Sequence, residues 1–201
     1  NTNSEVACDN PQRISYTELD ARCRRLASQL AALGVGRGDT VAMLAPNIPA
    51  ALDALYAVPM LGAVLNMINT RLDAKAVRFM LDHGEAKVFL TDTEYAATSG
   101  PAIAGLAREI TVVDIDDPLG AGGERLSQLD YDALLAAGEA GFAGEGVADE
   151  WDAIMLNYTS GTTGDPKGVV FHHRGAYISA LSNALHYGMT RNCVYLWTLP
   201  L

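Results

Sequence analysis

The chain has 201 residues, of which 49% are hydrophobic and 19% charged, so it is long enough to bury a substantial core. Its formal net charge of −10 argues against nucleic acid as the main partner, because binding to phosphate backbones needs clustered Lys and Arg. The acidity does not exclude a small anionic ligand held by backbone N–H groups.

Cysteine usage and hydropathy indicate the compartment. The three cysteines, Cys8, Cys23 and Cys193, form no CxxC pair, which argues against a disulfide framework or a zinc site. Reduced cysteines fit a cytoplasmic protein, and no signal peptide is visible. The longest uncharged run, 54–70, is interrupted by proline, glycine and asparagine, so we expect no transmembrane segment.

The first clear element is a helix at 16–34, where apolar residues recur at helical spacing and Gly34 ends the pattern. Thr17 and Asp20 approximate a capping box at its start. Strands and helices then alternate to the end of the chain. The expected strands are 39–47, 63–69, 86–92, 109–116, 153–160, 168–173 and 193–201, and the expected helices are 49–61, 73–84, 93–108, 126–138 and 174–188.

This alternation predicts an α/β fold with a mostly parallel β-sheet layered with helices on both faces. The small, acidic and glycine-rich segment 139–150 reads as a surface linker, and it is the best internal boundary.

The segment 158–173, "YTSGTTGDPKGVVFHH", carries the strongest functional signal. Glycines after a strand let backbone N–H groups turn inward and hold an anion, hydroxyls add donors, and a lysine adds positive charge. A polyphosphate uses all of these together, whereas a plain hairpin turn between two strands is the alternative. The polar candidates are Thr159, Ser160, Thr162, Thr163 and Lys167.

Other known loops do not fit this segment. A Walker loop needs Lys followed by Ser or Thr, but Lys167 precedes Gly168, and a nucleophile elbow needs Gly where Tyr158 stands. His172 and His173 are adjacent at a strand end, where they can point to opposite faces, so we expect no shared metal site. One of them could instead line the ligand pocket.

The run "YTSGTTGDPKGVV" resembles the phosphate-binding signature of adenylate-forming enzymes, which include acyl- and aryl-CoA synthetases, luciferases and peptide-synthetase adenylation domains. The resemblance extends to "YTELDARCRRLASQLAALGVGRGDTVAMLAPN" and to "GAVLNMINTRLDAKAVRFMLDHGEAKVFLTD". The elements after the loop are most similar to fatty and short-chain acyl-CoA synthetases.

The resemblance implies a two-step ligase reaction with ATP, Mg²⁺ and coenzyme A. A carboxylic acid is converted to an acyl-adenylate with release of pyrophosphate, and the coenzyme A thiol then displaces AMP. Carried onto this sequence, the resemblance places seven residues on the β- and γ-phosphates of ATP: Thr159, Ser160, Gly161, Thr162, Thr163, Gly164 and Lys167.

The resemblance also implies that residues 1–201 are a partial N-terminal AMP-binding domain, with a sub-boundary near 139–150 and the C-terminal domain absent. The family's adenine-binding segment and C-terminal catalytic lysine are not in these residues, so we assign no catalytic residue and expect this stretch alone to be inactive. Luciferase-like or peptide-synthetase chemistry and a non-catalytic nucleotide-binding module remain the alternatives. The sequence does not identify the acid or the oligomeric state.

Overall fold

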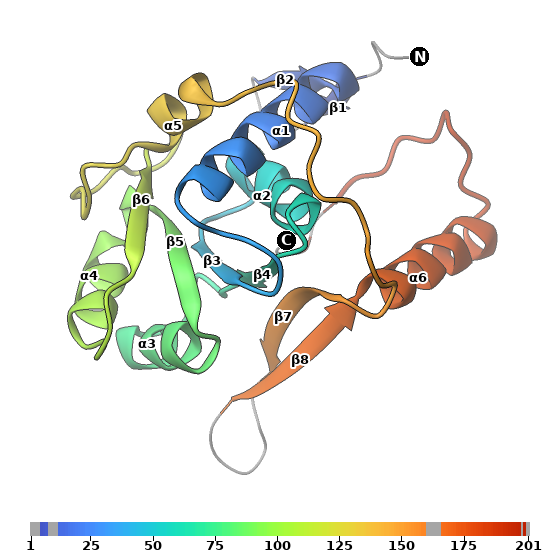
Figure 1. Ribbon diagram of the computed structural model, residues 1–201. Coiled ribbons are helices and arrows are strands. Elements are labelled where there is room, and N and C mark those ends of the chain that lie inside the picture. Colours follow the sequence, from blue (N-terminus) through green and yellow to red (C-terminus); the bar gives the residue numbers. More distant parts are fainter. Residues whose placement is uncertain (1–4, 8–11, 160–165, 198, 200–201) are drawn as a thin grey trace.

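The structure is a computed structural model that describes residues 5–7, 12–159, 166–197 and 199 (Figure 1). Its centre is a six-stranded sheet in the order β6-β5-β3-β4-β7-β8, in which neighbouring strands from β6 to β7 are parallel and β8 is antiparallel to β7. The strands are β3 (Thr40–Leu44), β4 (Val64–Met67), β5 (Ala86–Asp92), β6 (Thr111–Ile115), β7 (Ala153–Thr159) and β8 (Lys167–His172). A separate two-stranded sheet joins β1 (Glu5–Ala7) to β2 (Arg13–Ser15). The predicted α/β fold is confirmed.

Helices cover both faces of the parallel part of this sheet. The helices α1 (Tyr16–Ala32), α2 (Pro49–Met60) and α5 (Tyr131–Ala137) pack with one buried cluster. The helix α3 (Ala74–His83), the short 3₁₀ turn η1 (Thr93–Tyr95) and the helix α4 (Ala96–Ala104) lie on the side of the second cluster. The last helix, α6 (His173–His186), lies apart from the others (Figure 1).

The burial of the central strand β3 explains why polar and apolar residues do not alternate in its sequence. All five of its residues are buried, and the four apolar ones divide between the two clusters. Val41 and Met43 face α1 and α2, whereas Ala42 and Leu44 face α3. A parallel strand covered by helices on both faces must be apolar on both, which is the pattern that the sequence shows.

The predicted capping box at Thr17 and Asp20 is wrong. The helix α1 begins at Tyr16, and its cap is Ser15, whose side chain accepts a hydrogen bond from the backbone N–H of Glu18. Ser15 is the last, extended residue of β2, and this geometry suits an N-cap. Asp20 instead pairs with Arg24 one turn along the helix.

Two further predictions were too long. The helix α5 begins at residue 131 and not at 126, because the N–H groups of Leu126 and Ser127 donate to the Asp114 carboxylate. The strand predicted at 193–201 is also wrong for 193–197, which are described as irregular; residues 198, 200 and 201 lie outside the described part. No described strand pairs with this segment, and Val194 is 99% exposed.

The segment 139–150 contains no helix or strand, yet it is anchored to the body. The N–H of Glu145 donates to the carbonyl of Met60 in α2, and Arg24 of α1 donates to the carbonyl of Phe142. These contacts hold the connection between α5 and β7 against α1 and α2. Among the described residues, no helix is both long and apolar enough to cross a membrane.

Candidate functional site

A cleft of about 510 Å³ opens where three neighbouring strands, β3, β4 and β7, reach their carboxyl ends. Its walls come from the loops that leave β3 and β4 and from the last residues of β7. The polar and conformationally restricted positions in these walls are Pro46, Asn47, Asn69, Arg71, Asn157 and Tyr158.

The cleft exists because two consecutive connections leave the sheet in opposite directions. The connection after β3 enters α2 on one face, and the connection after β4 enters α3 on the other. Pro49 begins α2, and the side chain of Asp73 caps α3 by accepting from the N–H of Ala76. Open α/β sheets bind ligands at such a point, outside the carboxyl ends of the strands.

The strand β7 leads directly from this cleft into the glycine-rich loop. Asn157 and Tyr158 line the cleft, and Thr159 is paired across the hairpin with Lys167, the first residue of β8. The sheet therefore holds both ends of the loop beside the cleft. The remaining predicted phosphate contacts, Ser160, Gly161, Thr162, Thr163 and Gly164, lie outside the described residues, so their roles stay predictions.

Lys167 is an exposed cation at the end of this loop. Within the described part of the chain, no carboxylate forms an ion pair with its ammonium group. Lys87, by contrast, is paired with Asp39 at 2.9 Å and also donates to the carbonyl of Gly34. Of these two lysines, Lys167 is thus the one whose charge is available to an anion near the cleft.

Tyr158 is held by aromatic neighbours on α3. Its hydroxyl shares a 2.8 Å hydrogen bond with Nδ1 of His83, whose ring stacks on Phe79 at 5.3 Å between centroids. Burial raises the pKa of the Tyr158 phenol above its usual value, so it stays protonated at neutral pH. The phenol is therefore a neutral hydrogen-bonding group at the start of the loop.

The segment near the end of the chain also reaches this region. The side-chain amide of Asn47, in the loop after β3, donates to the backbone carbonyl of Leu199 at 2.7 Å. Residues 152 positions apart in the sequence thus meet at the cleft wall.

The two adjacent histidines have structural roles. Nδ1 of His172 accepts from the N–H of Gly175 and caps α6, while its ring packs against Trp151. His173 is the first residue of α6, and neither histidine lines the cleft at the strand ends. In the part of the chain that is described, no group of three or more His, Cys, Asp or Glu residues is arranged to hold a metal ion.

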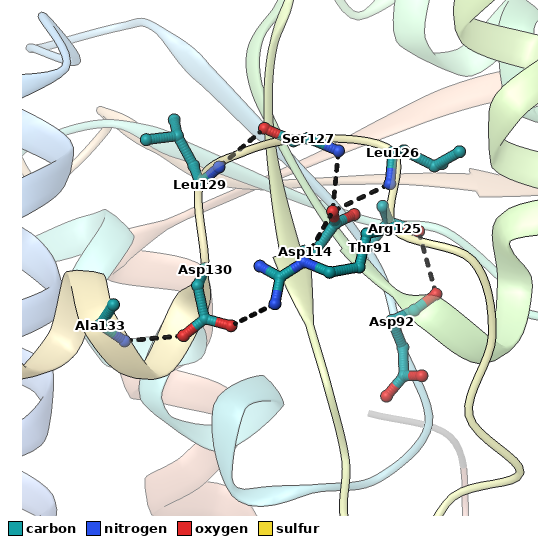
Figure 2. Close-up of polar contacts among 9 residues, drawn as sticks. All are labelled: Thr91, Asp92, Asp114, Arg125, Leu126, Ser127, Leu129, Asp130 and Ala133. Atoms are coloured by element: carbon teal, nitrogen blue, oxygen red, sulfur yellow. Dashed lines mark hydrogen bonds and ion pairs between the residues drawn. The ribbon is translucent and has the colours of Figure 1, made fainter.

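A second group of charged residues lies around the end of β6, where it holds the segment 125–130 in place (Figure 2). One oxygen of the buried Asp114 accepts from the N–H groups of Leu126 and Ser127 at 2.9 and 2.8 Å. Arg125 bridges Asp114 to Asp130, which in turn caps α5. These groups mostly satisfy one another, and they fix the turn that leads into α5.

An ion pair with a fully buried carboxylate joins the three helices α1, α2 and α5. Arg22 of α1 binds both carboxylate oxygens of Asp53 in α2, and the hydroxyl of Tyr131 in α5 donates to the same carboxylate at 2.8 Å. Asp53 is 0% exposed. Nearby, burial raises the pKa of the Cys23 thiol to about 12, so Cys23 is an inert packing residue of α1.

Sequence reasoning missed part of the cleft. The sequence assigns no role to Asn47, Asn69, Arg71 and Asn157, nor to the hydroxyl of Tyr158, whose ring packs against the second buried cluster. A signal was present, because polar residues directly follow or end three apolar strands. What the sequence lacked was the strand order, which places β7 beside β4 and so brings these residues together.

The fold is an open α/β sheet with a cleft outside the carboxyl ends of its parallel strands, the place where sheets of this class bind ligands. Over residues 1–201 the chain matches the model of the family described as AMP-binding enzyme, and it belongs to that family.

Several relatives found by sequence are named as CoA ligases. An acetate/butyrate–CoA ligase from Arabidopsis thaliana is 45% identical over 94% of this chain and 36% of the relative. A trans-cinnamate:CoA ligase from Petunia hybrida is 42% identical over 94% of this chain and 36% of the relative. The chain therefore spans about a third of the length of the relatives that it matches.

Solved structures agree on the fold. An anthranilate CoA ligase in complex with anthranoyl-AMP superposes with a TM-score of 0.82 at 21% identity, covering 90% of this chain and 34% of that one. An o-succinylbenzoate CoA synthetase from Bacillus subtilis, in complex with its acyl-adenylate intermediate, superposes with a TM-score of 0.75 at 31% identity, covering 95% and 44%.

The expectation of a cytoplasmic location is wrong by this comparison. The acetate/butyrate, trans-cinnamate and benzoate CoA ligases that match the chain are named as peroxisomal. Cysteine usage does not separate the two compartments, because a peroxisomal address is a short receptor-read motif and not a property of composition.

Proposed function

We propose that this chain supplies the nucleotide-binding part of a carboxylate–CoA ligase. The observation that carries the proposal is the position of the two strand ends that flank "TSGTTGDPKG". Thr159 of β7 pairs with Lys167 of β8, directly after the residues of β7 that line a cleft outside the carboxyl ends of the strands, where open α/β sheets bind ligands. The named activities of the relatives, which activate acetate, butyrate or cinnamate, support the same reaction class.

In this proposal the loop binds the β- and γ-phosphates of ATP. The hydroxyls of Thr159, Ser160, Thr162 and Thr163 donate to phosphate oxygens, Gly161 and Gly164 present backbone N–H groups, and Lys167 neutralises the charge. The acid's carboxylate oxygen forms a bond to the α-phosphorus as the bond to pyrophosphate breaks. The loop residues stabilise the charge that builds on the departing pyrophosphate.

The second step consumes the acyl-adenylate. The sulfur of coenzyme A forms a bond to the acyl carbon, and the bond from that carbon to the AMP oxygen breaks. We propose Mg²⁺ as the counter-ion that enters with ATP. Among the described residues no cluster of metal-ligating side chains is present, so we derive no step through a protein-bound ion.

The substrate is proposed to be a small carboxylic acid. The relatives that match the chain are named for acetate, butyrate, cinnamate and benzoate, so short-chain and aromatic acids are the first to screen. A place in fatty acid metabolism follows only if short aliphatic acids are the better substrates in that screen.

The test is ATP–pyrophosphate exchange in the full-length protein that carries this chain. Replacing Lys167 with Ala should reduce the exchange rate by about 100-fold, because a charge-stabilising donor is lost. Lys75→Ala is the matched control, since Lys75 is an exposed lysine on α3 that does not line the cleft. Residues 1–201 alone should give background exchange.

Two other results would contradict the role of Lys167 or the ligase activity. Equal exchange in the wild type and in Lys167→Ala would contradict the role of Lys167. Binding of ATP without exchange for any acid would support the alternative of a non-catalytic nucleotide-binding module.

A further inference from the structure

The strand ends that bracket residues 160–165 are tied to α3 through one side chain, Tyr158. It lies at the end of β7, two residues before the segment, and its ring reaches α3. The same ring covers the start of β8, because Tyr158 is the cross-strand partner of Gly168.

The position opposite Tyr158 has little room for a side chain. A Cβ atom built on Gly168 would lie 3.5 Å from a ring carbon of Tyr158 and 2.9 Å from a methyl of Leu156. The close contact is with the end of the Leu156 side chain, and the Tyr158 ring lies over β8 at an ordinary van der Waals distance from this position. One ring thus contacts both strands that lead into and out of the loop.

His83 fixes the direction of this ring. It is the last residue of α3, its Nδ1 lies 2.8 Å from the Tyr158 hydroxyl, and the two rings meet nearly edge to face at 76°. Phe79, one turn earlier on α3, stacks on His83 and also meets Tyr158 at 6.2 Å, edge to face. A helix residue 75 positions away therefore sets the rotamer of Tyr158.

The helix α3 is itself connected to the cleft. It follows directly on the 68–72 segment that lines the cleft, and Met80 on its buried side lines the cleft beside Tyr158. A rigid element therefore carries both the cleft wall and the groups that hold Tyr158, and this arrangement suits precise positioning of a site.

We propose that His83 is a positioning residue for ATP binding, acting through Tyr158 to hold both ends of the glycine-rich loop at the cleft. This rests on the proposed function of the loop. Fixing the strand ends beside a binding site in advance reduces the ordering that binding of a ligand requires, and this favours binding. His83 itself touches no substrate in this role.

The experiment measures steady-state kinetics of the full-length protein. Tyr158→Phe, which removes only the hydroxyl, and His83→Ala should each raise the KM for ATP by about threefold to tenfold, the range expected for one lost hydrogen bond. The KM for the carboxylic acid should not change. The double variant should be no worse than the more impaired single variant, because both changes remove the same contact.

Two controls separate positioning from general destabilisation. His186→Ala removes an exposed histidine of α6 that forms a similar ring contact with Tyr187, and it should leave all kinetic constants unchanged. His83→Gln keeps a hydrogen-bonding side chain and should restore much of the ATP affinity. Thermal melting of every variant shows whether the fold survives.

Failure of the positioning role and failure of the proposed function give different results. If the wild type exchanges no pyrophosphate with any acid, the proposed function fails. If the wild type is active and Tyr158→Phe and His83→Ala keep its KM for ATP, or raise the KM for ATP and for the acid alike, the positioning role of His83 is overturned.

Discussion

The body around β3 and the hairpin–helix unit of β7, β8 and α6 both contain many apolar residues. The two regions differ in how far those side chains are buried. Every residue of β3 is buried, while α6 contains no buried residue and β8 is exposed along most of its length. Val170, Phe171 and Leu185 are among the large apolar side chains that this unit leaves exposed.

The difference shows that apolar composition alone does not bury a segment. The β3 residues have helices on both faces, whereas β8 is an edge strand and α6 stands apart from the body (Figure 1). Contiguous exposed apolar surface generally marks a contact surface for further protein. The body therefore determines folding stability, and the hairpin–helix unit presents the loop and an open apolar surface.

The sharpest test of this contrast uses the same residue type in both regions. Phe89→Ala in β5, at a side chain that is 0% exposed, should lower the free energy of unfolding by about 3–5 kcal/mol. Phe171→Ala in β8, at a side chain that is 44% exposed, should cost about 1 kcal/mol or less. Urea unfolding followed by circular dichroism measures both, and equal losses would refute the contrast.

The next effect concerns the buried ion pair of the body. Asp53→Ala should lower the free energy of unfolding by about 2–4 kcal/mol, because it leaves Arg22 and the buried hydroxyl of Tyr131 without their shared acceptor. Asp20→Ala breaks the exposed pair with Arg24 and should cost less than about 1 kcal/mol. The urea midpoints of the two variants should differ clearly; similar midpoints would show that burial adds nothing to the pair.

Much of the body was predictable from the sequence, because its signals are local. Apolar runs without alternation indicated strands buried on both faces, and helical spacing located α1, α2 and α3 within a few residues. The predicted helix at 126–138 is longer than α5, because the start of α5 depends on Asp114. This residue binds the N–H groups of Leu126 and Ser127, and it lies 12 or more positions before them in the sequence. Such long-range capping leaves no local pattern.

The hairpin–helix unit was less predictable for the same reason. The glycine-rich loop was recognisable from its residue types, but the contact of Tyr158 with His83 depends on the order of β4 and β7 in the sheet. The segment 193–197 has a strand-like composition, and composition cannot reveal that no described strand lies beside it.

The smallest expected effect is a pH dependence at Asp130, at the start of α5. The N–H of Ala133 donates to this carboxylate and Arg125 pairs with it, and together they hold its pKa below the usual value. A carboxyl group with a lowered pKa in the folded state stabilises the protein above its unfolded pKa, roughly 4. This contribution is lost as pH falls from there through the lower, folded value.

Asp130→Asn tests this linkage, because Asn also caps helices but carries no charge to titrate. The wild type should be slightly more stable than the variant at pH 7, and the gap between their urea midpoints should shrink as the pH falls below about 4. A gap that stayed constant down to pH 3 would show that the charge of Asp130 contributes nothing, and that capping geometry alone stabilises the turn into α5.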